Sequence, residues 1–387
     1  MPKLIHQRVL LTLLVLSVLS ALFLPFISFA PNRLVSGQPI MLAQSLHGVD
    51  WLGMLPLALL LACVFLPVSR WRLIMALLAS ELLFLGLIAL SGREATLLAA
   101  QSSSTLARTS FGSGLWSLAA LMLLVAADAL SRLTPNVFWR TLGNAQIWLL
   151  LVLILLSGQL DNLALLREYA NRREVFDAAL LRHLQLLLGT LFPALIIGVP
   201  LGLWCYRHGR RQSGVFALLN IIQTVPSVAL FGLLMAPLAG VAKAFPALAR
   251  IGINGIGLAP ALIALVLYAL LPLVRSVVAG LQQVPREVLE SARGMGMTRR
   301  QIFLQVEVPL ALPVLLTGLR VVAVQTVGMA TIAALIGAGG FGSIIFQGLL
   351  SSALELVLLG VIPVIALAVI VDTLFKFTLS LMERERG

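Results

Sequence analysis

Long apolar runs alternate with short polar segments along most of this chain. Each run is close to the roughly 20 mostly apolar residues that a membrane-spanning helix requires. The pattern predicts an all-α polytopic membrane protein with about ten transmembrane helices. The ten runs lie at about 9–30, 51–67, 73–91, 114–131, 142–158, 184–205, 214–238, 257–280, 310–336 and 354–377.

The composition agrees with a membrane protein. Hydrophobic residues make up 60% of the chain and charged residues 11%, and the mean hydropathy is +1.05. Soluble domains carry about 25% charged residues, so the lipid bilayer is a predicted partner. The first run is longer than the apolar region of a signal peptide and nine runs follow it, so we expect it to be retained as a span.

The positive charge of the chain carries information about its orientation. The formal net charge is +12, but the Lys and Arg are spread along the loops, so we expect no nucleic-acid partner. With the N-terminus in the cytoplasm, more Lys and Arg fall in the inside loops than in the outside ones, as the positive-inside rule requires. The sequence therefore predicts that both termini are cytoplasmic.

A polar, charge-balanced segment divides the chain at residues 159–183. Apolar residues recur there at helical spacing, so we expect an extracytoplasmic amphipathic helix that leads into the sixth span. Residues 1–158 form a predicted N-terminal extension of five spans. Residues 184–387 form a second membrane domain with a cytoplasmic loop at 281–309.

Patterns of catalytic and metal-binding residues are absent from the sequence. No Lys precedes Ser or Thr, so the phosphate-binding loop G-x-x-x-x-G-K-[ST] is missing. The four His are scattered without metal-site spacing. Cys63 and Cys205 lie in apolar runs, where packing is their simplest role. We expect no cofactor, no metal and no enzymatic activity in this chain.

Glu81 lies near the middle of the third run with no evident partner. An ionisable residue within a span is a functional candidate by default, at a cost of about 2.5–3.5 kcal/mol on insertion scales. A self-contained, ion-coupled secondary transporter would use such a group, often in paired repeats. An interhelical hydrogen bond is the simpler role, so both interpretations of Glu81 stay open.

The charged stretch after the eighth run has the pattern of two short helices joined by a glycine turn. Pro285 suits the first turn of a helix, and Gly296 is typical of the turn that ends one. Thr298 and Gln301 form a capping box that predicts a second helix, which should end before Pro309. A simple linker needs only a few polar residues, so the pattern favours a docking surface.

This hairpin resembles the coupling loop of the membrane subunits of binding-protein-dependent ABC importers. The pattern of that loop is E-A-A, three residues, G, nine residues and I-x-L-P. The matching positions here are Glu290, Ser291, Ala292, Gly296, Val306 and Pro309. The resemblance implies a type I ABC importer permease core in the C-terminal half, and docking of the loop on a cytoplasmic ATP-binding subunit that hydrolyses ATP.

Three further stretches resemble the osmoprotectant branch of that family, which carries glycine betaine, choline and related solutes. They read VPLG at 199–202, NIIQTVPSVALFGLL at 220–234 and IGAGGFGSIIFQGL at 336–349. The resemblance implies an importer of the bacterial plasma (inner) membrane. It also implies a second permease subunit, identical or related, and an extracytoplasmic substrate-binding protein. A permease for another small solute, such as an amino acid, is the alternative.

Proline and glycine in the second domain predict irregular helices near a translocation path. Pro226 interrupts the seventh run, and neighbours or water must satisfy the backbone groups it frees. Four glycines after the ninth run predict an irregular or re-entrant turn at the outer face; close helix packing without gating is the alternative. These glycines are Gly337, Gly339, Gly340 and Gly342.

Overall fold

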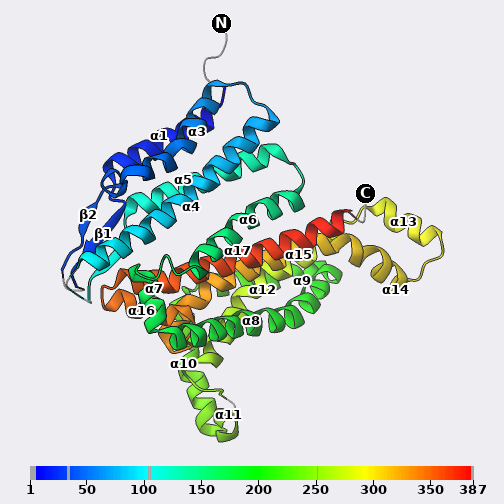
Figure 1. Cartoon of the computed structure of the whole chain (residues 1–387). Coiled ribbons are helices and arrows are strands. Elements are labelled where there is room, and N and C mark those ends of the chain that lie inside the picture. Colours follow the sequence, from blue (N-terminus) through cyan, green and yellow to red (C-terminus); the bar gives the residue numbers. More distant parts are fainter. Residues whose placement is uncertain (1–5, 33–34, 103, 105, 251, 385–387) are drawn as a thin grey trace. The chain divides into compact units, whose positions relative to one another are not determined.

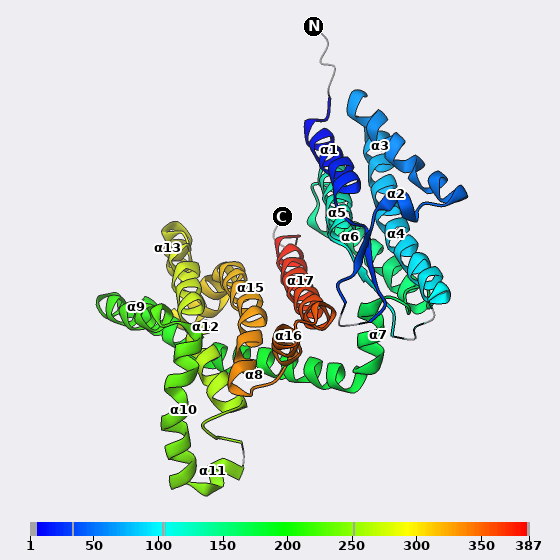
Figure 2. The ribbon, with the colours of Figure 1, turned by 90° about the vertical axis from the view of Figure 1, so that its left-hand side faces the viewer.

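The computed structural model describes residues 6–32, 35–102, 104, 106–250 and 252–384. The chain forms two compact units, Met1–Asn171 and Arg172–Gly387. Helices dominate both units (Figures 1 and 2). Each unit buries its own apolar core.

The first unit is built around two long helices. Helix α4 (Arg70–Gln101) packs along α5 (Ser113–Leu133), and α1 (Arg8–Phe23) and α3 (Leu55–Phe65) pack against this pair. Side chains of all four helices fill the core between them. The remaining helices of the unit are α2 (Leu42–Ser45), the 3-10 helix η1 (Gly48–Met54), α6 (Val137–Leu156) and α7 (Ala164–Asn171).

A small sheet in the first unit is a feature that the all-α prediction missed. Strand β1 (Ile27–Ala30) pairs antiparallel with β2 (Gln38–Ile40) and β3 (Arg108–Phe111) in the order β2-β1-β3. The predicted first span, 9–30, is therefore wrong at its end. Helix α1 stops at Phe23 because Pro25 disfavours helical backbone in the residue before it, and the chain continues as a strand.

Helix α12 (Leu258–Gln282) is the central helix of the second unit. It packs against both α8 (Arg173–Arg207) and α15 (Val308–Ile332). A Cβ atom at Gly202 would lie 2.6 Å from the Val277 Cβ, so this glycine permits the close approach of α8 and α12. The other elements are α9 (Gly209–Thr224), α10 (Ser227–Ala244), α11 (Pro246–Arg250), α13 (Arg286–Gly294), α14 (Arg299–Ile302), the π turn η2 (Phe303–Glu307), the 3-10 helix η3 (Ala333–Ile336), α16 (Phe341–Leu350) and α17 (Leu354–Arg384).

Eight helices in the described part of the chain are long and apolar enough to cross a membrane. They confirm a polytopic helical membrane protein but not ten full spans. Helix α1 has 16 residues and α3 has 11, fewer than the roughly 20 that a span requires. The seventh predicted run, 214–238, is divided into α9 and α10, because the helix breaks before Pro226.

The segment predicted as one amphipathic helix, 159–183, is broken into two pieces. Helix α7 ends at Asn171, and α8 begins at Arg173 and continues without interruption to Arg207. The sixth membrane helix thus starts well before residue 184. The two compact units separate at the same place, between Asn171 and Arg172.

Candidate functional site

The predicted hairpin forms two short helices at one end of the second unit. Helices α13 and α14 extend beyond the ends of α12 and α15, at the end where the C-terminus of α17 also lies (Figures 1 and 2). Pro285 is the residue that precedes α13, with extended backbone. The fixed φ of proline suits this position, and its missing N–H costs nothing there. The hairpin is therefore a defined structure rather than a loose linker.

Helix α13 exposes most of its side chains. Glu290 and Ser291 are exposed, and the Ser291 hydroxyl donates to the Glu287 carbonyl oxygen at 2.8 Å. Ala292 is the exception, at 2% exposure. Met295, which directly follows the helix, is 75% exposed. The helix thus offers a carboxylate and an apolar end on a short rigid element.

The turn at Gly296 is closed by two backbone hydrogen bonds. The Met297 N–H donates to the Ala292 carbonyl at 3.2 Å, and the Gly296 N–H donates to the Arg293 carbonyl at 2.9 Å. This is the Schellman arrangement, with Gly296 in the left-handed region at φ +79°. The prediction that glycine ends the first helix is confirmed. A Cβ at Gly296 would meet no atom within 4 Å, so only the backbone conformation requires glycine here.

The second helix of the hairpin begins as predicted and ends differently. The Thr298 hydroxyl accepts from the Gln301 N–H, and the Gln301 side chain accepts from the Thr298 N–H at 2.8 Å, which completes the capping box. The helix was expected to end before Pro309, and this is wrong. A π turn at Phe303–Glu307, containing Val306, leads directly into α15. Pro309 then occupies the first turn of α15, where proline is tolerated.

The break at Pro226 is held by hydrogen bonds between α9 and α12. The Gln223 amide donates to the Tyr268 carbonyl oxygen at 3.0 Å, and the Tyr268 hydroxyl donates to the Val225 carbonyl oxygen. About two turns further along α12, Arg275 donates to the Asn220 amide oxygen at 2.8 Å. Three hydrogen bonds therefore fix the end of α9, and the Val225 carbonyl next to the break has a partner. The helix break is a built feature of the second unit.

The glycine segment predicted as an irregular turn is one. The Ala338 N–H donates to the Ala333 carbonyl at 3.2 Å and the Gly337 N–H to the Ala334 carbonyl at 3.0 Å, a second Schellman arrangement. Gly337, Gly339 and Gly340 have φ values of +78°, +85° and +77°. We call residues 337–342, with Gly342 at the start of α16, the glycine loop. Gly342 is packed so tightly that a Cβ there would lie 1.9 Å from the Thr331 carbonyl oxygen.

A buried histidine lies against the glycine loop. His183 of α8 is 0% exposed, and its Nε2 lies 3.1 Å from the Val327 carbonyl oxygen of α15. Its ring centroid is 5.4 Å from that of Phe341, and a Cβ at Gly340 would lie 3.1 Å from its Nδ1. The loop is therefore irregular and close-packed at once, so the two alternatives posed by the sequence are not exclusive.

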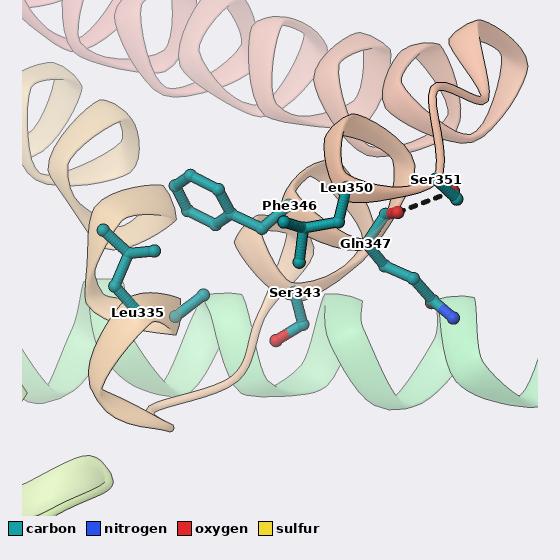
Figure 3. Close-up of a pocket in the computed structure, with 7 residues that line it drawn as sticks. Leu335, Ser343, Phe346, Gln347, Leu350 and Ser351 are labelled. Atoms are coloured by element: carbon teal, nitrogen blue, oxygen red, sulfur yellow. Dashed lines mark hydrogen bonds between the residues drawn. The ribbon is translucent and has the colours of Figure 1, made fainter.

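A cavity of about 460 Å³ lies beside the glycine loop, between η3 and α16. Leu335 of η3 lies on one side, and Phe346 and Leu350 of α16 on the other (Figure 3). Ser343 and Gln347 add polar groups to this mainly apolar wall. A surface of this kind, apolar with a few polar groups, suits a small organic solute.

Two protein families match this chain in succession. The family described as "ABC transporter permease YehY, N-terminal domain" matches residues 6–166. The family described as "Binding-protein-dependent transport system inner membrane component" matches residues 194–382. The osmoprotectant import permease protein OsmW of Salmonella typhimurium is 38% identical over 193 residues, which are 50% of this chain and 85% of OsmW.

This chain belongs to the inner membrane permease family of binding-protein-dependent transport systems. The glycine betaine/carnitine/choline permease OpuCD of Bacillus subtilis is also similar to the permease, at 36% identity over 53% of this chain and 85% of OpuCD. Among solved structures, the inward-facing MetNI methionine ABC transporter is similar to the permease at 22% identity and a TM-score of 0.47. The similar region covers 55% of the permease and 98% of the MetNI chain. The resemblance stated from the hairpin is confirmed, and the permease is a multi-pass inner membrane transport subunit.

Several ionisable groups within the membrane helices of the permease have side-chain partners. The Gln146 amide of α6 donates to both Glu81 carboxylate oxygens at 3.0 and 3.1 Å. Glu81 therefore makes the interhelical hydrogen bond that was one of its two interpretations. In the second unit, Arg320 of α15 pairs with Asp372 of α17, which also lies 2.7 Å from the Lys376 ammonium. Over the residues that the structure describes, no group of three His, Cys, Asp or Glu could hold a metal ion.

Several residues that shape these sites were not found from the sequence. They act through contacts between distant helices, as His183 does with Val327 and Tyr268 with Val225. An embedded His before an apolar run was the one available signal. It did not indicate which carbonyl or loop the side chain would contact.

Proposed function

We propose that the permease carries a small osmoprotectant such as glycine betaine and forms half of the translocation pathway. Its relatives OsmW and OpuCD are named for import of osmoprotectants and for glycine betaine, carnitine and choline transport, which supports this substrate class. The cavity beside the glycine loop is mainly apolar with a few polar groups, as a small methylated solute would require.

The coupling partner is a separate cytoplasmic subunit that binds and hydrolyses ATP. The observation that carries this proposal is the hairpin, in which Glu290, Ser291 and Ala292 lie one turn before the Schellman turn at Gly296. Docking would place α13 in a groove of the ATPase, with Val306 and Pro309 joining the hairpin to α15. A second permease subunit, identical or related, and an extracytoplasmic binding protein complete the assembly.

The gate lies at the outer end of the second unit in this proposal. Gly337, Gly339, Gly340 and Gly342 form the irregular segment beside the cavity, and Pro226 breaks the helix that leads to it. Glu81 also stays a candidate for translocation, but within the first unit, where Gln146 already donates to its carboxylate. Movement of the glycine loop against η3 would open or close the path to the solute.

The domain assignment remains a proposal as well. Residues 1–158 would be a membrane extension, 159–183 an extracytoplasmic segment and 184–387 the permease core. Cysteines introduced at Asn171 and at Gln301, after replacement of Cys63 and Cys205, should be labelled by an impermeant thiol reagent from opposite sides of the membrane. Labelling of both from the same side would contradict this topology.

Uptake into vesicles tests the substrate. The permease is reconstituted with its ATPase, and uptake is measured with the binding protein and a panel of glycine betaine, choline, carnitine and an amino acid. ATP-dependent uptake of a betaine, absent when either partner is omitted, is the expected result. Uptake driven by an ion gradient without ATP, or uptake of the amino acid alone, would reject the proposal.

A further inference from the structure

A second and larger cavity lies within the first unit, where neither the hairpin nor the glycine loop takes part. Its volume is about 890 Å³, within the range of ligand pockets, about 300–1,000 Å³. One face of α4 forms a wall, η1 forms another, and the turn that follows α6 forms a third. The five-span region therefore contains a cavity large enough to hold a ligand.

The lining of this cavity changes character along α4. Leu83 and Leu90 line it toward the middle of the helix, and Arg93 and Thr96 line it toward the C-terminal end. The turn at 157–162 adds Gln159 and Asn162 at that same polar end. Helix α4 is 32 residues long, so these residues are separated along a single membrane helix. The cavity is amphipathic, with one apolar end and one polar end.

The depth of the polar end follows from the helix geometry. Arg72 lies in the first turn of α4 and Arg93 lies 21 residues further on, about 31 Å at 1.5 Å per residue. The hydrocarbon core of a bilayer is about 30 Å thick. When Arg72 lies at one membrane surface, Arg93 lies at the head groups of the other. Trp71 and Trp51 are 77% and 55% exposed, at the two levels where tryptophan is enriched.

The charges that line the polar end form one ion pair, and His47 and Glu94, 3.7 Å apart, form a second pair behind it. Arg93 pairs with Asp50, and the Asp50 carboxylate also accepts from the His47 N–H at 3.1 Å. The His47 N–H, and after it the Arg93 guanidinium, hold the pKa of Asp50 below its usual value. The Asp50 side chain is 15% exposed and that of Arg93 is 54% exposed. The Asp50 carboxylate is therefore held in the cavity wall, whereas the more exposed Arg93 guanidinium can rotate toward a ligand.

The pairing restricts which ligand fits. An anion that took Arg93 would leave the Asp50 carboxylate without its cation, and a cation that took Asp50 would leave Arg93 unpaired. A zwitterion satisfies both, since two ion pairs replace one and no charge is left unpaired. A primary ammonium also donates hydrogen bonds to a carboxylate, which a trimethylated ammonium cannot do.

We propose that this cavity binds a phospholipid whose head group carries a phosphate and a primary ammonium, with the phosphate on Arg93 and the ammonium on Asp50. The acyl chains would follow the apolar wall formed by Leu83 and Leu90. Leu52 and Leu97, at 61% and 39% exposure, add apolar groups beside the charged pair. The lipid is favoured over a free zwitterion because the apolar end of the cavity lies at the depth of the hydrocarbon core.

The test uses the full-length permease in bilayer discs of equal parts phosphatidylethanolamine, phosphatidylglycerol and phosphatidylcholine. Native mass spectrometry measures which lipids stay bound. The expected result is enrichment of phosphatidylethanolamine over both other lipids. Arg93→Gln should lower this enrichment about fivefold, the effect of about one basic residue at a lipid surface. Asp50→Asn should remove the preference for phosphatidylethanolamine over phosphatidylglycerol.

Two control variants distinguish a specific loss of lipid binding from a folding defect. Arg132→Gln breaks an exposed pair with Asp128 in the same unit, away from the cavity, and should behave as wild type. Arg93→Lys keeps the positive charge and should retain the lipid. Equal binding of the three lipids by wild type, unchanged enrichment in Arg93→Gln, or stronger retention of phosphatidylglycerol would overturn the proposal. Displacement of the lipid by glycine betaine would assign the cavity to a free zwitterion instead.

Discussion

The two Schellman turns of the second unit have the same backbone hydrogen bonds and lead into segments that differ in packing. At the hairpin, the Met297 and Gly296 amides close the end of α13; at the glycine loop, the Ala338 and Gly337 amides close the end of η3. A Cβ at Gly296 would meet nothing within 4 Å, and one at Gly337, the matching glycine of the second turn, would have its nearest atom at 4.0 Å. The packing closes only further along the glycine loop, where a Cβ at Gly342 would meet the Thr331 carbonyl oxygen at 1.9 Å. The first turn thus leads into an exposed helix start and the second into a packed joint.

This difference separates two reasons for keeping glycine. At Gly296 the requirement is conformational, since φ is +79°, and the space above it is free for a partner. At Gly342 the requirement is steric, since the neighbouring backbone leaves no room. A substitution should therefore damage assembly at the first position and folding at the second.

The largest effect on folding is expected from Gly342→Val. Its side chain would overlap the Thr331 carbonyl, which is backbone and cannot turn aside. Overpacking of this kind costs about 1–3 kcal/mol or more, so the amount of folded permease in the membrane should fall strongly. Abundance on a blot and the thermal unfolding midpoint in detergent measure this. Gly328→Ala, in open space on α15, is the matched control and should leave both unchanged.

His183→Ala should destabilise the packing of the glycine loop against α8. The change removes a fully buried ring that contacts Phe341 and the Val327 carbonyl. By comparison with other buried truncations, we expect a loss of about 2–3 kcal/mol in the free energy of unfolding. The unfolding midpoint is the readout, and His208→Ala, at an exposed helix end, is the control. An unchanged midpoint for His183→Ala would mean that the glycine loop does not depend on this contact.

Gly296→Val should leave folding nearly intact and abolish coupling. The left-handed conformation costs a branched residue about 1–2 kcal/mol, and the added side chain would enter the docking surface. Abundance in the membrane should be near normal, while uptake and its coupling to ATP hydrolysis should fail in the reconstituted complex. Gly294→Ala, at an ordinary helical position in open space, should transport normally. Normal uptake by Gly296→Val would show that the hairpin is only a linker.

Glu290→Ala should produce the smallest effect of the four. Glu290 is exposed on α13, so its removal should change the free energy of unfolding by less than about 0.5 kcal/mol. ATP-driven uptake should fall partially, because one polar partner of the docking surface is lost. Glu287→Ala removes a carboxylate from the first turn of the same helix and is the comparison. Equal losses in the two variants would indicate a general charge effect rather than a contact made by Glu290.

The parts of the fold that were predictable from sequence are those fixed by near neighbours. The capping box of Thr298 and Gln301 and the turn at Gly296 depend on residues within one or two turns of each other, and both were correctly predicted. The long apolar helices follow from the same kind of local information. The exposed helix that carries Ser291 and Ala292 also followed from local signals, Pro285 before it and Gly296 after it.

The parts that were missed depend on partners far along the chain. The helix continues through Pro309 by way of the π turn at 303–307. Pro309 then lies in the first turn of α15, where its missing N–H leaves no helical hydrogen bond unmade. The pair of Arg320 and Asp372, and the bond from Gln146 to Glu81, join helices that are remote in sequence. The strands at 27–30 and 108–111 were hidden because each is only four residues long.

That π turn has a mechanical consequence. Because the helix does not stop at Pro309, residues Arg299–Ile336 form one stretch of 38 residues, about 57 Å long at 1.5 Å per residue. Helix α14 of the hairpin and the glycine loop are therefore joined by one continuous helical stretch. A rotation of roughly 5° about the hairpin end would displace the far end by about 5 Å over that length, close to one turn of helix. In the proposed importer, a small rotation imposed by the ATPase would therefore become a displacement of several Å at the glycine loop.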